Sequence, residues 1–280
     1  MRWTLGGRSD DVEDRRSEGG GAFQIGGIHV GIGGFIILLI LSLVFHRNFL
    51  SLLNTSPSGT MVRQTDPTRD PAEEREVQFV SFVLDDAQKT WIQVFSARNL
   101  PYRHAKLVLF RDSIDSACGL AQSASGPFYC PEDEKVYIDL GFYDELKQRF
   151  GAPGEFAQAY VIAHEIGHHL QKQLEIEPKV RAAQEKNPGN RNELSVRLEL
   201  QADCMAGVWG HSTEQRQLLE QGEMKEGLNA ASAVGDDRLQ RMSTGHVNPE
   251  TFTHGSSADR TRWFERGFDG GSLDSCNTFQ

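Results

Sequence analysis

Basic residues are in the minority in this chain of 280 residues: 29 Lys and Arg stand against 39 Asp and Glu, which gives a formal net charge of −10. A chain without a surplus of cations has little with which to neutralise phosphate groups, so we expect no nucleic-acid partner. The four cysteines include no C-x-x-C pair, and this absence argues against a cysteine-ligated structural zinc site. No internal repeat is visible. The composition is that of an ordinary globular protein.

Ionisable side chains are almost absent from residues 25–45, "IGGIHVGIGGFIILLILSLVF", where a single histidine interrupts the run. The length just suffices for a helix to cross a bilayer, and membrane helices tolerate glycine. No A-x-A site follows, and the charged segment ahead is long, so a cleaved signal peptide fits less well. A buried core helix also fits poorly, because the run has no polar face. We predict one transmembrane helix.

This apolar run separates three other regions. Residues 1–24 mix both signs of charge with glycine and have no apolar period, so we predict a polar, loosely structured N-terminal tail. Residues 46–72 include "NTSPSGT" and "DPTRDP", which are typical of a turn-rich linker. Residues 73–280 are predicted to form a single globular domain.

The arginines around the apolar run favour one orientation by a small margin. Arg8, Arg15 and Arg16 precede the run, whereas Arg47 and the more distant Arg63 follow it. By the positive-inside rule, this excess favours a cytoplasmic N-terminus and an outside C-terminal domain. We therefore expect a single-pass protein of the inner (cytoplasmic) membrane, with its globular domain periplasmic or otherwise extracytoplasmic.

Apolar spacing in the globular region predicts an α+β domain that is mainly helical. Apolar residues from 77 to 95 recur at helical spacing, whereas "KLVLF" (106–110) and "KVYID" (135–139) read as short strands separated by a loop. "FYDELKQRF" is predicted to be a short helix that ends at a glycine and a proline. Further helices are predicted at 155–174, 192–210, 213–234 and 256–267.

The first candidate site lies in "AYVIAHEIGHHLQKQL", residues 159–174, where His164 and His168 stand four residues apart. Both rings then project from one face of a helix, and two neutral imidazoles at that separation can bind one Zn²⁺. Glu165 can reach a metal-bound water without being a ligand, which is where a general base is needed. The H-E-x-x-H pattern alone arises by chance too often to decide the function.

A catalytic zinc site needs a third protein ligand. The stretch "NELSVRLELQADCMAGVWG" has helical spacing and puts Glu199 and Asp203 on one face. Glu199 would be the third ligand, and Asp203 would accept the remaining ring N–H of a ligating histidine and fix its tautomer. The alternative is that both are plain surface acids. The small neighbours Ala202, Ala206 and Gly207 count against that alternative, since they suit a close crossing of two helices.

Two other candidates fit less well. Glu265 and Asp269 repeat the four-residue spacing, but Gly267 interrupts them near a helix end. His169 points about 100° away from His168 around a helix, so we expect an exposed or capping residue.

His254, in "FTHGSSADR", is a candidate catalytic residue, because a zinc peptidase needs a donor for the oxyanion besides the metal. The same stretch also reads as a simple turn in which Ser256 or Ser257 caps the next helix. Tyr160, one turn before His164, could donate as well, although a tyrosine there is more often a core residue.

The cysteines offer one local pairing. Cys118 and Cys130 flank a short loop between two predicted strands, which favours a disulfide between them. Cys204 and Cys276 could pair or stay free. A disulfide would place the domain in an oxidising compartment, in agreement with the predicted orientation.

The chain resembles the bacterial neutral zinc metallopeptidase family of membrane-anchored proteins over nearly its whole length. The resemblance is carried by "MRW…VEDRR", the apolar run, "FYCPEDEKVYIDLGFYDEL", "VIAHEIGHHLQ", "LELQADCMAG" and "FTHGSSADRTRWFERG". It implies that His164, His168 and Glu199 bind zinc and that Glu165 is the catalytic glutamate. The fold we expect is a zincin-like metallopeptidase domain with a small sheet, preceded by one transmembrane helix.

The predicted function is hydrolysis of a polypeptide substrate by a membrane-anchored enzyme with one Zn²⁺ per chain. Bound zinc would lower the pKa of its water toward ~7 and polarise the scissile carbonyl. Glu165 would take the proton of the water and pass it to the leaving amine. Two alternatives stay open: a membrane-tethered zinc-binding scaffold without activity, and a zinc amidase that acts on cell-wall material.

Overall fold

The structure is a computed structural model that describes residues 1–18, 71–122, 126–148, 151–152 and 154–279. Met1–Gly19 and Pro67–Gln280 together make one compact unit. The predicted transmembrane run, residues 25–45, lies outside the described residues, as does the predicted linker up to residue 70. Of the helices that are described, none is both long and apolar enough to span a membrane.

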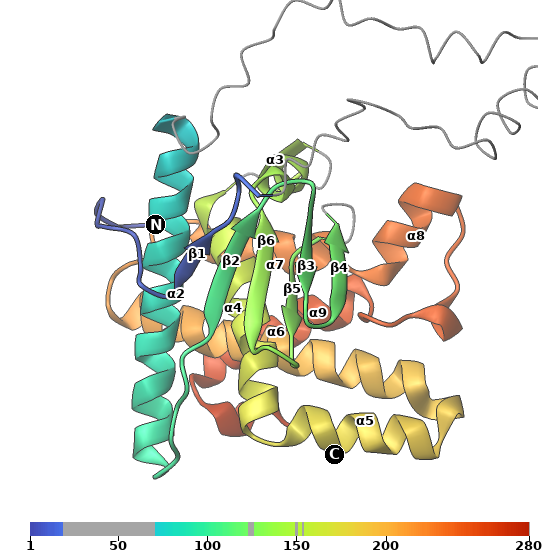
Figure 1. Ribbon diagram of the computed structural model, residues 1–280. Helices are drawn as coiled ribbons and strands as arrows, with labels where there is room; N and C mark the ends of the chain where they lie inside the picture. The colour runs from blue at the N-terminus through green and yellow to red at the C-terminus, as the bar shows by residue number, and fades with distance from the viewer. Residues whose placement is uncertain (19–70, 123–125, 149–150, 153, 280) are drawn as a thin grey trace, which may run out of the picture. The chain divides into compact units, whose positions relative to one another are not determined.

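A four-stranded sheet forms one layer of this unit (Figure 1). The first three strands in the sheet are parallel, and the fourth is antiparallel to its neighbour. Their order is β1 (Val12–Asp14), β2 (Lys106–Phe110), β6 (Lys135–Asp139) and β5 (Phe128–Cys130). A separate hairpin consists of β3 (Ser113–Ser116) and β4 (Gly119–Gln122). The predicted strands β2 and β6 are confirmed, and the remaining strands were not predicted because each has only three or four residues.

Successive side chains of β2 face two different apolar clusters. Leu107 and Leu109 pack into the main core, whereas Val108 and Phe110 join a smaller cluster on the other side. The smaller cluster also contains Ile114, Cys130 and Tyr137. Because strand side chains alternate between faces, a strand that is apolar throughout needs cover on both sides. Helices cover the face that carries Leu107 and Leu109. The β3–β4 hairpin contributes Ile114 to the cover of the opposite face.

Helices make up most of the described chain, which confirms the predicted α+β, mainly helical class. They are α2 (Pro71–Ala97), α3 (Gly141–Gln148), α4 (Glu155–Gln173), α5 (Ile176–Lys186), α6 (Arg191–Gln215), α7 (Glu223–Ala233), α8 (Asp236–Thr244) and α9 (Ser257–Gly270). Short 3₁₀ turns are η4 (Pro188–Asn190), η5 (Pro249–Thr251) and η6 (Leu273–Cys276). In Figure 1, α4, α6, α7 and α9 lie behind the sheet, and α2 runs along one side.

One predicted helix is wrong in its limits. The stretch 213–234 was expected to be continuous, but α6 ends at Gln215 and α7 begins at Glu223. Between them, Gln217 and Gly222 adopt positive φ values of 58° and 95°. A right-handed helix cannot continue through such residues, so the chain turns here.

Glycines let three helices approach closely, as the small residues near Asp203 predicted. A Cβ on Gly167 of α4 would lie 2.9 Å from the Cα of Ala202 on α6. A Cβ on Gly207 of α6 would collide with the backbone of Phe264 on α9, and one on Gly267 would collide with Cys204. These contacts fix α6 between α4 and α9.

The predicted loose tail, residues 1–24, is wrong for residues 1–18. These residues supply β1, which pairs in parallel with β2. The guanidinium of Arg16 is fully buried and forms ion pairs of 2.8 Å with Asp14 and with Glu73 of α2. The mixed charges that looked like a solvated tail are therefore ion-pair partners inside the fold.

Candidate metal centre

Two helices bring the predicted zinc ligands together. His164 and His168 project from α4, and Glu199 projects from α6, which crosses α4 at Gly167 and Ala202. One donor atom from each ligand lies within 4.8 Å of the other two. In the described part of the chain, this is the group of His, Cys, Asp and Glu side chains that is arranged to bind a metal ion.

The spacing of the three donors suits zinc. Nε2 of His164 lies 3.2 Å from Glu199 Oε2, and Nε2 of His168 lies 3.5 Å from Glu199 Oε1. Ligand atoms about 2.0–2.2 Å from a tetrahedral zinc are about 3.4 Å apart, and each of these distances from a histidine to an oxygen of Glu199 is close to that value. Two nitrogens and one carboxylate leave a fourth position, as catalytic rather than structural zinc sites do.

Glu165 lies next to the ligands without belonging to them. Its side chain is buried beside the cavity onto which the ligands open. Burial raises the pKa of the Glu165 carboxyl, and the neighbouring His164 and His168 offset only part of this effect. A carboxylate with a raised pKa is a better proton acceptor, which suits a general base.

Asp203 holds His164 from behind, as predicted from sequence. Its Oδ1 accepts the Nδ1–H of His164 at 2.9 Å and the hydroxyl of Tyr160 at 2.5 Å. Arg260 of α9 donates through Nε to Oδ2 at 2.8 Å and through Nη2 to Oδ1 at 2.9 Å. With Nδ1 of His164 engaged as a donor to Asp203, Nε2 is the ring nitrogen that would bind a metal ion beside Glu199.

Arg260 favours the ionised form of the buried Asp203 carboxyl group. Asp203 is fully buried, and burial alone would favour its neutral form. The charge of Arg260, together with His164, outweighs burial and lowers the pKa of Asp203 to about 2. The buried carboxylate is therefore ionised, and its pairing with Arg260 offsets the cost of burial.

Sequence reasoning missed Arg260. The helix α9 buries Phe264, Gly267 and Phe268 on the same face as Arg260. An arginine one turn ahead of an apolar face is the signal that could have identified it, because a buried guanidinium requires a carboxylate partner.

His254 lines the same cavity and has its own carboxylate partner. Nδ1 of His254 lies 3.2 Å from Oδ1 of Asp236, and Oδ2 of Asp236 accepts the backbone N–H groups of Thr253, His254 and Gly255. The hydrogen bond to Asp236 raises the pKa of His254. The helix that follows is capped by Ser256, whose side chain accepts the N–H of Asp259, so the predicted helix cap is confirmed.

The cavity has a volume of about 650 Å³. Its polar wall contains the ligands, Glu165, His254 and Arg260, and its apolar wall includes Phe128 and Tyr129 of β5. Ligand cavities typically combine apolar walls with a few polar groups in this way.

Two other predictions have clear outcomes. His169 is fully buried, with Tyr129 and the carbonyl of Arg103 as hydrogen-bond partners at 3.0 and 2.7 Å, so the prediction of an exposed or capping residue is wrong. The rejected alternative ligands Glu265 and Asp269 are both exposed.

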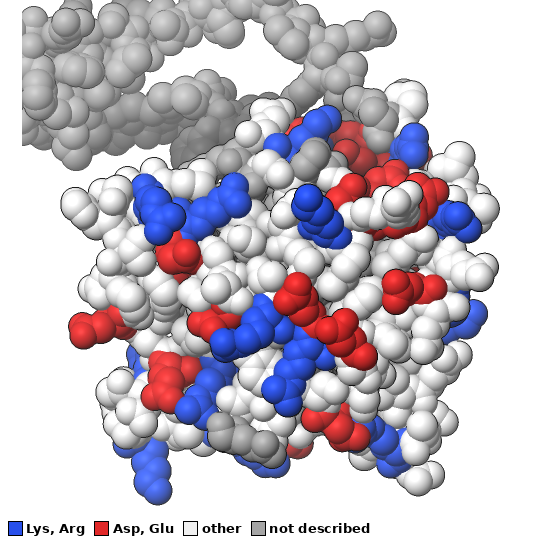
Figure 2. Space-filling view, turned by 180° about the vertical axis from the view of Figure 1, so that it is seen from behind, with Lys and Arg blue, Asp and Glu red and all other residues white. Residues whose placement is uncertain are grey.

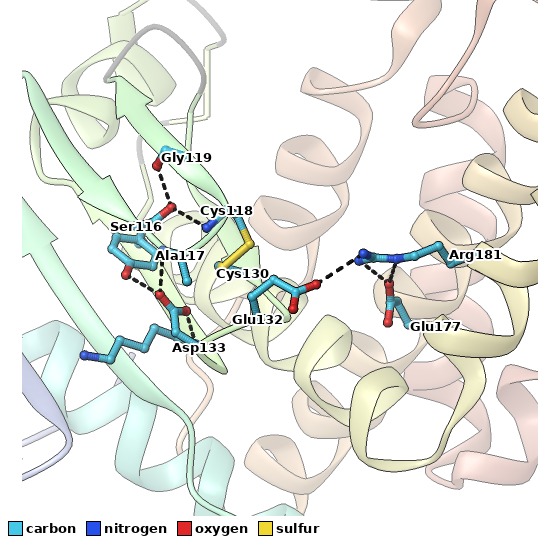
Figure 3. Close-up of a disulfide and its surroundings, with 11 residues drawn as sticks. Ser116, Ala117, Cys118, Gly119, Cys130, Glu132, Asp133, Glu177 and Arg181 are labelled. Carbon is cyan, nitrogen blue, oxygen red and sulfur yellow. Dashed lines mark hydrogen bonds and ion pairs between the residues drawn. A yellow bond between two sulfur atoms is a disulfide. The ribbon is translucent and has the colours of Figure 1, made fainter. Parts of the chain in front are cut away.

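Cys118 and Cys130 form the predicted disulfide, which joins the β3–β4 hairpin to β5 (Figure 3). The residues after β5 are held from a second direction, because Glu132 pairs with Arg181 of α5 at 3.2 Å, and Arg181 pairs with Glu177. Both contacts fix β5 beside the cavity. Cys204 and Cys276, whose pairing the sequence left open, also form a disulfide.

Charged side chains of both signs are spread over the face of the molecule seen in Figure 2. Lys and Arg side chains alternate there with Asp and Glu, and they form no continuous basic area on that face. This mixture agrees with the net charge of −10.

Comparisons with other proteins identify the family of this chain. The family described as "Putative neutral zinc metallopeptidase" matches residues 1–279. "Uncharacterized protein YpfJ" of Escherichia coli (strain K12) is 49% identical over 287 residues, which cover 100% of this chain and 99% of that protein. "Uncharacterized protein Rv2575" of Mycobacterium tuberculosis (strain ATCC 25618 / H37Rv) is 41% identical over 189 residues, or 64% of this chain and 63% of that protein. No solved structure matches the chain. The chain belongs to the neutral zinc metallopeptidase family.

Proposed function

We propose that this protein is a zinc-dependent peptidase with one Zn²⁺ held by His164, His168 and Glu199. The observation that carries the proposal is the placement of Glu165 beside three donors that leave a fourth position toward the cavity. Bound zinc would supply an acidified water and a polarised carbonyl.

The side chains of the cavity would then handle the protons. Glu165 takes a proton from the attacking water and returns it to the nitrogen of the leaving amine. His254, whose pKa the hydrogen bond to Asp236 raises, donates to the oxygen of the attacked carbonyl as negative charge develops there. Asp203 and Arg260 act through His164 and keep its ring in place.

The position of β5 supports an extended polypeptide as the substrate. In the described sheet, β5 is the last strand and pairs only with β6. Its residues Phe128 and Tyr129 line the cavity. A terminal strand can pair with an extended peptide through main-chain hydrogen bonds, which would carry the scissile bond past Glu165. This arrangement also supports the zincin-like interpretation of the fold.

We further infer that residues 25–45 attach the protein to a membrane and that the domain lies on the extracytoplasmic side of the inner membrane. The length and composition of the run support the attachment. Disulfides persist in oxidising compartments, so the pairs Cys118–Cys130 and Cys204–Cys276 support the location.

The single crossing that the sequence predicted conflicts with the packing of β1. One crossing between residues 18 and 71 would leave β1 and β2 on opposite sides of the bilayer, yet these strands are hydrogen-bonded neighbours. Two of the arginines on which the predicted orientation depends form ion pairs within the domain: Arg8 pairs with Glu74 and Arg16 with Glu73. The attachment we propose therefore has both flanks on the same side.

The proposed activity is tested with two kinds of substrate and with a ligand variant that is compared with a control variant. The full chain, with and without a chelator, is given an unfolded polypeptide and, separately, a cell-wall fragment with amide bonds. We expect cleavage of the polypeptide, loss of cleavage with chelator and recovery with Zn²⁺. The Glu199→Ala variant should lose the metal, whereas Glu193→Ala should behave as wild type, because Glu193 is an exposed residue of the same helix that pairs with Arg197.

Each alternative has its own outcome in this experiment. Cleavage of the cell-wall fragment alone would favour a zinc amidase. Zinc binding without hydrolysis of either substrate would favour the scaffold.

A further inference from the structure

The second ligating histidine has a partner that the proposed function does not use. Nε2 of His168 lies 3.5 Å from Glu199, and its Nδ1 lies 2.9 Å from Oε1 of Gln171, one turn further along α4. An amide oxygen has no hydrogen to donate, so Nδ1 of His168 must be the donor. When a metal is bound, the lone pair would then be on Nε2, the ring nitrogen that faces Glu199.

The orientation of the Gln171 amide is fixed by two further contacts. Its Nε2 donates to the carbonyl of Leu198 at 2.7 Å and to Oε1 of Gln201 at 3.1 Å. A flipped amide would point its oxygen at these acceptors, and the Gln171 side chain is fully buried, where an unsatisfied group is costly. Oε1 of Gln171 is thereby held toward His168.

Gln201 is held in turn by the C-terminal turn η6. Its Nε2 donates to the carbonyl of Cys276 at 2.9 Å, and Cys276 is bonded to Cys204 of α6. The hydrogen bonds therefore run from His168 through Gln171 and Gln201 to a turn that a disulfide fastens to the ligand-bearing helix.

We propose that Gln171 is a positioning residue that keeps His168 in the Nδ1–H tautomer with Nε2 toward the metal, and that Gln201 and η6 hold Gln171 in place. This proposal rests on the zinc site proposed above. The two histidines are supported in different ways: His164 by the ionised Asp203 and His168 by a neutral amide.

Metal affinity in the full chain tests the proposal. The variant Gln171→Met keeps the size of the side chain and removes the acceptor, whereas Gln171→Glu keeps an acceptor for Nδ1. The control Gln173→Met changes a glutamine of the same helix whose amide bonds Arg103 and His169 instead. Zn²⁺ affinity is measured by competition with a chromophoric chelator, and the absorption spectrum of bound Co²⁺ reports the ligand geometry.

We expect Gln171→Met to bind Zn²⁺ about 10–100-fold more weakly and to change the Co²⁺ spectrum. Gln171→Glu should recover part of the affinity, because it keeps the acceptor for His168 but loses both donor contacts. The control should match wild type in both measurements. Gln201→Met, which leaves the ligands and Gln171 unchanged, should weaken binding to a smaller degree.

Two results would overturn the proposal. One is a Gln171→Met variant with wild-type affinity and an unchanged Co²⁺ spectrum. The other is equal weakening in Gln171→Met and Gln171→Glu, which would assign the effect to the lost donor contacts. Because metal binding is the readout, a wild-type chain that binds Zn²⁺ without cleaving peptides would contradict the proposed function and leave this proposal standing. A wild-type chain that binds no Zn²⁺ would contradict both.

Discussion

At the scale of single residues, the pairing of His254 with Asp236 predicts how activity depends on pH. The hydrogen bond to Asp236 raises the pKa of His254 above its ordinary value, so the ring stays a charged donor to higher pH. Activity should fall as the pH rises through this raised pKa. The Asp236→Asn variant removes the negative charge and keeps an acceptor for the backbone N–H groups. We expect the basic limb of the profile of kcat/KM against pH to move to lower pH, and an unmoved limb would assign His254 no part in catalysis.

The buried ion pair of Arg260 and Asp203 makes a second prediction at this scale. Arg260→Met leaves the Asp203 carboxylate buried without its counter-ion, and removing one partner of such a pair costs about 3–5 kcal/mol. Urea denaturation should show a loss of that size. Arg262→Met on the same helix breaks an exposed pair with Asp259, which should change stability by less than about 1 kcal/mol. Equal effects of the two substitutions would show that the buried pair has no special role.

At the scale of elements, the distance between the two ligand helices depends on Gly167. Gly167→Ala places a methyl group 2.9 Å from Ala202 and must push α4 and α6 apart. Overpacking of this kind costs about 1–3 kcal/mol, and the ligands move with the helices, so Zn²⁺ affinity should fall as well. Gly189→Ala, where the added Cβ has its closest contact at 3.5 Å, is the control. Unchanged stability and unchanged affinity in Gly167→Ala would contradict this role of the helix crossing.

The elements also show what the sequence was able to predict. Long periodic helices and the two five-residue strands were predictable because burial imposes a regular apolar spacing on them. The candidate ligands were predictable because residues four apart on a helix lie on one face, as His164 and His168 do on α4. Glu199 and Asp203 have the same spacing on α6. The strand β1 was not, since three residues of mixed polarity carry no period and gain their structure from β2. Arg260 and Asp236 were missed because their roles come from contacts between segments far apart in the sequence. Gln171 lies one turn from His168 on α4, but its amide is oriented by Leu198 and Gln201 of α6, which the sequence alone does not show.

At the scale of the whole molecule, the pairing of β1 with β2 predicts on which side of the membrane each part of the chain lies. Leu5 and Met242 are exposed, on the N-terminal segment and on α8 respectively. In Leu5→Cys and Met242→Cys variants, a thiol reagent that cannot cross membranes should label both positions in intact spheroplasts. Labelling of Met242→Cys in intact spheroplasts and of Leu5→Cys only after lysis would establish the single crossing and contradict the packing of β1.

The function of the whole molecule depends most directly on Glu165. We would compare the wild-type chain with Glu165→Gln, measuring cleavage of an unfolded polypeptide and zinc content on the same samples. A general base contributes about 100-fold or more, so Glu165→Gln should hold a full complement of zinc and lose at least that factor in rate. A Glu165→Gln variant that binds zinc and cleaves at the wild-type rate would contradict the proposed peptidase mechanism.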